Sequence, residues 1–156
     1  MNNFVECKKY EYLFNNVPMV NCVYAITVNN RIVYIGATSN LRQAVSILYY
    51  DIKHNNGNFN IHRNNLLYDF LDDENYTVEV QIIEEVRGVK KKDMLKKKAI
   101  VDIKPPLNYR IPILDSDEDD YETQPLPNTI EETLSRAKFT LNKNIFSIRL
   151  KLEEED

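Results

Sequence analysis

Two short alternating segments joined by a pair of asparagines constrain the fold of this chain more than any other feature. Residues 22–28 read Cys-Val-Tyr-Ala-Ile-Thr-Val, residues 31–35 read Arg-Ile-Val-Tyr-Ile, and Asn29-Asn30 lies between them. Asparagine accepts the positive φ angles that a two-residue hairpin turn requires, so this pattern predicts a tight β-hairpin.

After the hairpin, segments whose apolar residues recur at helical spacing alternate with a segment whose apolar residues recur at strand spacing. Residues 41–54 carry one apolar stripe at helical spacing, with Ser39 or Asn40 as the cap, and the turn cluster after His54 ends this helix. A second helix is expected over 61–71, a half-buried strand over 77–82 and a third helix over 90–103, which Pro105-Pro106 ends. The sequence therefore predicts an α+β fold, with a small antiparallel sheet in the order β-β-α-α-β-α flanked by helices.

The last third of the chain differs in composition. Residues 115–120 are a run of like charges, which predicts a solvated acidic linker. Thr129 and Glu132 have the spacing of a capping box before an apolar helical stripe, and residues 146–152 alternate as an amphipathic strand. We expect four parts: an N-terminal arm (1–20), a main domain (21–113), an acidic linker (114–128), and a C-terminal helix and strand (129–156) that docks on the body or on another chain.

The hairpin also carries a familiar pair of motifs. Val23-Tyr24-Ala25 is followed ten residues later by Tyr34-Ile35-Gly36, and Pro105-Pro106-Leu107-Asn108 closes the predicted domain. Over residues 22–110 the chain resembles the GIY-YIG nuclease superfamily, and within it the phage endonuclease II group. The resemblance implies a three-stranded antiparallel sheet flanked by helices and, in active members, metal-dependent hydrolysis of phosphodiesters.

The same resemblance implies that the catalytic residues are incomplete. Tyr24 and Tyr34 match the family's tyrosines and are former active-site positions. The arginine ten residues after the second tyrosine is replaced by Ala44, and the metal-binding glutamate of a later helix is replaced by Lys96. No glutamate occurs between residues 86 and 114. The expected protein is a degenerate enzyme, or pseudoenzyme, that holds no metal.

Basic residues suggest binding in place of catalysis. Arg42 is either a solvated helix charge or a residue retained to contact phosphate. A dense lysine run is either a solvated helix face or a stripe that follows a phosphate backbone, and an acidic partner or the chain's own acidic linker would satisfy it equally well. The residues predicted to bind nucleic acid or a partner are Arg42, Lys91, Lys92, Lys97 and Lys98, and the run also includes Lys90, Lys96 and Lys104.

Charge and composition indicate the cellular compartment and the source of the protein. Residues 1–111 hold 15 basic against 12 acidic residues, a charge of +3, whereas residues 112–156 hold 5 against 12, a charge of −7. Two cysteines and no apolar leader argue against secretion, and no apolar run has membrane-spanning length, so we expect a cytoplasmic protein without membrane contact. The abundance of Asn, Lys, Ile and Tyr suggests an AT-rich source such as a phage, which would place the protein inside a host cell. His54 and His62 lie in or near polar turns without the spacing of metal ligands.

Three hypotheses for function follow. The preferred one is a GIY-YIG-like protein that binds DNA, other nucleic acid or a partner protein without cleaving it and without a cofactor, such as a phage or viral regulatory or counter-defence factor. The first alternative is an active Mg²⁺-dependent endonuclease, in which Ala44 is an engineered change or Asp93 is a displaced metal ligand. The second is a self-associating protein, a homo-oligomer whose strand over 145–152 pairs with a second copy.

Overall fold

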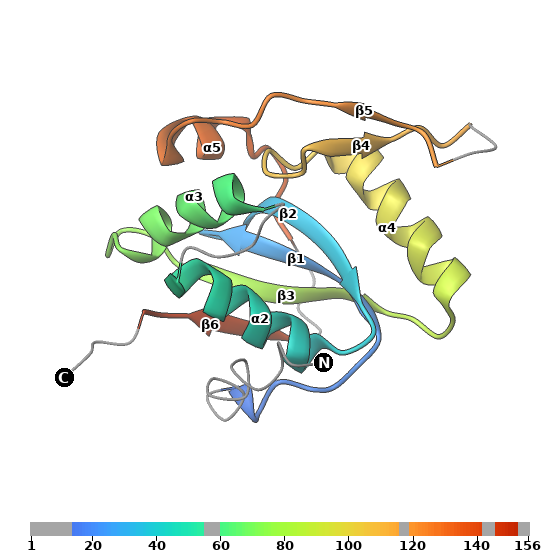
Figure 1. Ribbon diagram of the computed structural model, residues 1–156, viewed down its shortest axis with the longest axis horizontal. Helices are drawn as coiled ribbons and strands as arrows, with labels where there is room; N and C mark the ends of the chain where they lie inside the picture. The colour runs from blue at the N-terminus through green and yellow to red at the C-terminus, as the bar shows by residue number, and fades with distance from the viewer. Residues whose placement is uncertain (1–13, 55–59, 116–118, 142–145, 153–156) are drawn as a thin grey trace.

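The computed structural model describes residues 14–54, 60–115, 119–141 and 146–152, and its α+β architecture confirms the predicted fold class (Figure 1). In chain order the elements are β1 (Cys22–Val28), β2 (Arg31–Thr38), α2 (Leu41–His54), α3 (Ile61–Leu71), β3 (Val78–Glu85), α4 (Val89–Ile103), β4 (Arg110–Pro112), β5 (Tyr121–Thr123), α5 (Ile130–Arg136) and β6 (Ser147–Leu150).

The predicted hairpin forms, and it builds the centre of the main sheet. Asn29 and Asn30 adopt φ angles of 49° and 67°, as a two-residue turn between twisted strands requires. The four strands lie in the order β2-β1-β3-β6, and each neighbouring pair is antiparallel. The β1 and β3 strands are therefore central, while β2 and β6 form the edges.

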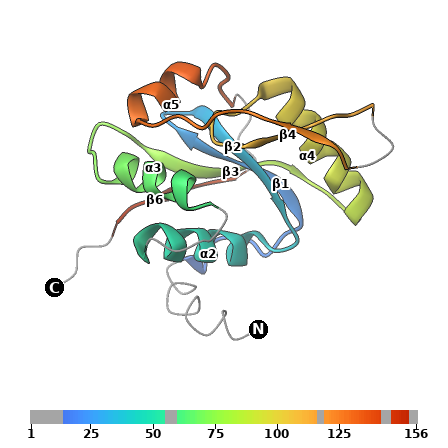
Figure 2. The same cartoon turned by 45° about the horizontal axis from the view of Figure 1, so that its top comes forward.

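Each face of the sheet buries its own apolar cluster. The larger cluster joins one face to α2 and α3, with Ile26, Leu48 and Phe70 among its members. The smaller one joins the other face to α4, with Ala25 and Ile100 among its members. Figure 2 shows the strands between α2 on one side and α4 with β4 and β5 on the other. The alternation in β1 thus serves two cores, one on each side.

The chain itself caps the outer edge of β2. Asn108 acts there like the backbone of an additional strand: its side chain accepts a hydrogen bond from Ile35 N and donates one to Ile35 O, each 2.9 Å long. Leu107 N also donates to Val33 O, and Ile32 N donates to Phe139 O. The Pro105–Asn108 segment is buried, so the residues that close the domain seal an edge that would otherwise expose unpaired backbone groups.

Three features differ from the expectation or refine it. The β4 and β5 strands pair as a hairpin that the sequence did not predict, with the acidic run 115–120 between them. Thr129 caps α5, since its Oγ1 accepts from Glu132 N at 3.0 Å, but the Glu132 carboxylate accepts from Asn128 N and not from the Thr129 N–H that a full capping box requires. The helix ends at Arg136 because Ala137 is extended. The final strand pairs with β3 of its own chain. Residues 1–13 of the predicted arm and residues 153–156 lie outside the described residues.

Candidate anion-binding site

The two motif tyrosines lie on one face of the hairpin. In the β1–β2 register Tyr24 lies opposite Gly36 and Ile26 lies opposite Tyr34, so both rings point toward the face that α2 and α3 cover. Both are half-buried against the larger cluster. Burial, and then the neighbouring Tyr34, raise the pKa of Tyr24 well above its ordinary value. Like other tyrosine hydroxyls at neutral pH, that of Tyr24 is protonated and can donate a hydrogen bond.

Gly36 has no side chain because the Tyr24 ring occupies that space. A Cβ atom at this position would lie 2.6 Å from Tyr24 Oη and 2.7 Å from its Cζ, closer than real Cβ contacts. The glycine of the second motif is thus explained by close packing with the tyrosine of the first. The cross-strand pair fixes where the Tyr24 hydroxyl lies.

An arginine from α3 completes the group. The Arg63 guanidinium lies over the Tyr34 ring, 4.5 Å from the ring centroid, in a cation–π contact. Arg63 is 8% exposed, and its Nε donates to Asn64 Oδ1 at 3.0 Å. We call Tyr24, Tyr34 and Arg63 the tyrosine–arginine cluster. Arg63 is not among the residues predicted from the sequence.

The outer nitrogens of Arg63 remain available. A guanidinium has five N–H donors, and within the described part of the chain its Nη atoms donate no hydrogen bond. They are not sealed in the core either, because Gln81 Oε1 is the single fully buried side-chain N or O atom without a partner among the described residues. The cluster therefore presents a nearly buried cation with unused donors at the surface of the protein.

Asp51 on α2 is the acidic group that acts on this arginine. Burial raises the pKa of Asp51 and the charge of Arg63 lowers it, so the two side chains influence each other electrostatically. No ion pair within 4.0 Å joins them, however, and no described carboxylate makes one with Arg63. Asp51 reduces the positive potential at the cluster without occupying the guanidinium.

Ala44 and Lys96 occupy the two positions at which the resemblance predicts a catalytic arginine and a catalytic glutamate. Ala44 lies half-buried in the first turn of α2, where its N–H donates to Asn40 O. Lys96 lies in α4, on the opposite face of the sheet, 3.9 Å from Asp93 Oδ1. Asp93, the alternative metal ligand, also makes a 3.0 Å ion pair with Lys97. The lysine run thus neutralises this carboxylate.

Arg42 makes contacts that the sequence did not predict. Its Nε donates to Val17 O at 2.8 Å and its Nη2 donates to Asn15 O at 2.9 Å. These bonds tie the segment before β1 to the start of α2. Because two of its donors are committed within the chain, Arg42 has less capacity to bind a phosphate than Arg63 has.

The predicted lysines are divided between paired and exposed positions. Lys92 Nζ donates to Asn21 Oδ1 and Lys97 Nζ donates to Asp119 Oδ1, each at 2.6 Å. Lys91 and Lys98 are exposed. The structure therefore brings Tyr24 and Tyr34 together but leaves the lysines of α4 on the other face of the sheet.

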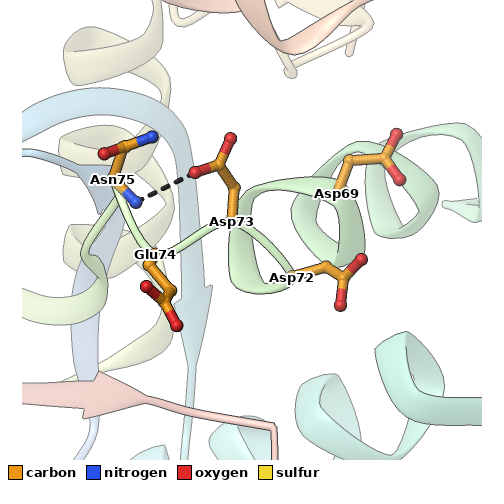
Figure 3. Close-up of a pocket in the computed structure, with 5 residues that line it drawn as sticks. All are labelled: Asp69, Asp72, Asp73, Glu74 and Asn75. Atoms are coloured by element: carbon orange, nitrogen blue, oxygen red, sulfur yellow. Dashed lines mark hydrogen bonds between the residues drawn. The ribbon is translucent and has the colours of Figure 1, made fainter.

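The histidines and a group of acidic residues lie elsewhere. His62 Nε2 lies 2.5 Å from Pro127 O, and the His54 ring packs on Tyr50. A hollow at the end of α3 is lined by Asp69, Asp72, Asp73, Glu74 and Asn75. Figure 3 shows that their carboxylates point in different directions and do not converge. Within the described residues no three His, Cys, Asp or Glu side chains form a group that could hold a metal ion.

None of the described helices is both long and apolar enough to cross a membrane. Comparison with models of protein families, with curated proteins and with solved structures found no match, so the resemblance of this chain to nucleases rests on the residues quoted above.

Proposed function

We propose that this protein is a degenerate GIY-YIG-like protein that binds the phosphate backbone of DNA at the tyrosine–arginine cluster without cleaving it. The observation that carries the proposal is the Arg63 guanidinium, which is nearly buried and held over Tyr34, and whose Nη donors bond to none of the residues that the structure describes. Among the described residues no carboxylate lies within ion-pair distance of this guanidinium, so a bound anion would form charge-assisted hydrogen bonds with Nη groups that water otherwise solvates. The cluster can therefore accept an anion.

A phosphodiester suits these donors. Two N–H groups of a guanidinium match two non-bridging phosphate oxygens, and such charge-assisted bonds are stronger than neutral ones. The protonated Tyr24 hydroxyl supplies another donor on the same face. A carboxylate would fit the guanidinium alone, but the motif resemblance favours a nucleic acid.

Binding without cleavage is supported by the residues at the expected catalytic positions. Phosphodiester hydrolysis needs an activated water and stabilisation of the developing charge. Most enzymes that catalyse it use a divalent metal for these tasks. The side chain of Ala44 carries no charge and cannot transfer a proton. Lys96 places a positive charge where the resemblance implies a metal-binding carboxylate. The exposed lysines of α4 would add non-specific attraction to a polyanion.

The test is the affinity of a labelled 20-base-pair duplex, measured by fluorescence anisotropy at low salt. Arg63→Gln should weaken binding about 10- to 100-fold, because hydrogen bonds to charged groups contribute about 1.5–3 kcal/mol. Arg149→Gln removes the same charge from an exposed position on β6 and is the matched control, with little expected effect. Thermal unfolding of each variant checks that it is folded.

Three results would contradict the proposal. The cluster is not the site if Arg63→Gln binds like the wild type, and the ligand is a protein or another anion if the wild type does not bind the duplex. Plasmid cleavage with Mg²⁺ or Mn²⁺ that Tyr34→Phe abolishes would establish the endonuclease alternative.

A further inference from the structure

The outer edge of β6 carries backbone groups that pair with none of the described residues, and their positions follow from the register. Ile82 N donates to Phe146 O at 2.9 Å, and Val80 lies opposite Ile148. In an antiparallel pair, hydrogen-bonded positions recur every second residue, so the N–H and C=O groups of residues 146, 148 and 150 point toward β3. Those of Ser147 and Arg149 consequently point away from the sheet.

No described segment pairs with this edge. The sheet order ends at β6, and the backbone groups of Ser147 and Arg149 make no hydrogen bond with any described residue. The β2 edge is different, because Asn108, Leu107 and Phe139 pair with it. One edge of the sheet is thus sealed by the chain and the other can accept a further strand.

The β6 strand is complementary to itself. If two copies pair antiparallel about a two-fold axis through Ile148, the outward groups of Ser147 face those of Arg149 in the second copy. This register gives roughly four inter-chain hydrogen bonds. It also places Ile148 against Ile148 of the second copy on the apolar face.

The charges in this register are compatible as well. On the other face each Arg149 lies beside Glu79 of its own β3, its partner in the register, and opposite Ser147 of the second copy. No like charges lie directly opposite each other, an arrangement that would be destabilising. Phe146 and Ile148 are half-buried, so the pairing would cover apolar surface that one chain leaves partly exposed.

We propose that two copies of this chain associate through their β6 strands, which makes one continuous eight-stranded antiparallel sheet. The occupant of the edge is a second copy because Ser147, Ile148 and Arg149 together satisfy the register, the hydrogen bonding and the charges. The contact is short, so the dimer forms with micromolar or weaker affinity, and its population depends on protein concentration.

Proline substitutions test this proposal, because the N–H groups of neighbouring residues point in opposite directions. Arg149→Pro removes a donor that points outward and leaves the β3–β6 bonds in place, and proline is tolerated in edge strands at such positions. Arg149→Ala, the matched control, removes the side chain and retains the donor. Ile148→Pro removes a bond to β3 and should destabilise the fold.

Sedimentation equilibrium of the full chain over a range of concentrations is the measurement. We expect the wild type and Arg149→Ala to dimerise, and Arg149→Pro to remain monomeric with an unchanged unfolding transition. A wild type that stays monomeric up to about 1 mM, an affinity weaker than a specific dimer requires, contradicts the proposal. Dimerisation of Arg149→Pro with wild-type affinity contradicts it equally.

Hydrogen exchange gives a second readout that needs no variant. The amides of Ser147 and Arg149 should become protected as the concentration rises, whereas the amide of Ile148 should be protected at every concentration through its bond to β3. Equal and concentration-independent exchange at Ser147 and Arg149 would contradict the proposal even if Arg149→Pro does not fold.

Discussion

The protein has two cationic regions, and they differ in how their charges are used. The lysine run of α4 is dense in sequence, but Lys92, Lys96 and Lys97 interact with Asn21, Asp93 and Asp119. The tyrosine–arginine cluster holds a single cation, Arg63, which is nearly buried and whose Nη donors make no hydrogen bond within the described part of the chain.

Under the proposed function, the number of charges in a segment is a poor guide to the binding site. Exposed lysines are well solvated, and their ion pairs contribute at most about 1 kcal/mol, so nothing in α4 requires an external anion. Arg63 lies where solvation is reduced and its orientation is fixed by Tyr34 and Asn64. A ligand that completes its hydrogen bonds gains more there than at a solvated lysine.

The largest predicted effect comes from disturbing the geometry of the cluster. Gly36→Ala places a methyl group against the Tyr24 ring, and overpacking of this kind costs about 1–3 kcal/mol. Chemical denaturation should show a loss of this size, together with weaker duplex binding. In the Tyr24→Ala background the same substitution should cost much less, because the clash is absent. Equal costs in the two backgrounds would contradict the packing argument.

A smaller effect is expected from Asp51, which reduces the potential at Arg63. Asp51→Asn should strengthen duplex binding severalfold at neutral pH and low salt. Because burial raises the pKa of Asp51, acidification below neutral pH should protonate it before an ordinary aspartate and so strengthen binding by the wild type. Anisotropy titrations at several pH values check this. Asp51→Asn should show a weaker pH dependence than Asp72→Asn, a matched control on an exposed carboxylate.

The smallest effect is expected on α4. Reversing both exposed charges, Lys91→Glu and Lys98→Glu, should weaken duplex binding about two- to fivefold at low salt and less at 0.15 M, where screening is stronger. If each lysine contacted a phosphate, the slope of log affinity against log salt would instead fall by roughly 0.9 per residue. If this double substitution weakens duplex binding more than Arg63→Gln does, the binding site lies on α4 and the proposal is contradicted.

Local patterns in the sequence predicted most of the fold. The hairpin, α2, α3, β3 and α4 have clear periods, and Asn29-Asn30 and Pro105-Pro106 mark their ends. The β4–β5 hairpin was not predicted, because each strand has three residues and the charged run between them suggested a linker. The early end of α5 was not predicted either. An apolar stripe at helical spacing cannot show that Ala137 leaves the helix and is buried in the core.

The candidate site was predicted in part. The motif spacing brought Tyr24 and Tyr34 to one face, but Arg63 joins them only through the tertiary packing of α3. One signal could have identified it: Arg63 shares a helical stripe with Leu66, Leu67 and Phe70, all buried, so it places a charge on the apolar face of a helix. Arg42 could not be assigned from the sequence, because its acceptors are backbone carbonyls of the segment before β1.

The most direct test of the central claim is a nuclear magnetic resonance titration of the ¹⁵N-labelled protein with the duplex, which follows the Arg63 side-chain Nε–H signal and the backbone amides. We predict that the Arg63 signal shifts and saturates with the affinity measured by anisotropy, and that the largest backbone changes surround Tyr34 and Arg63. The account is contradicted if the Arg63 signal does not move while the amides of α4 shift and saturate.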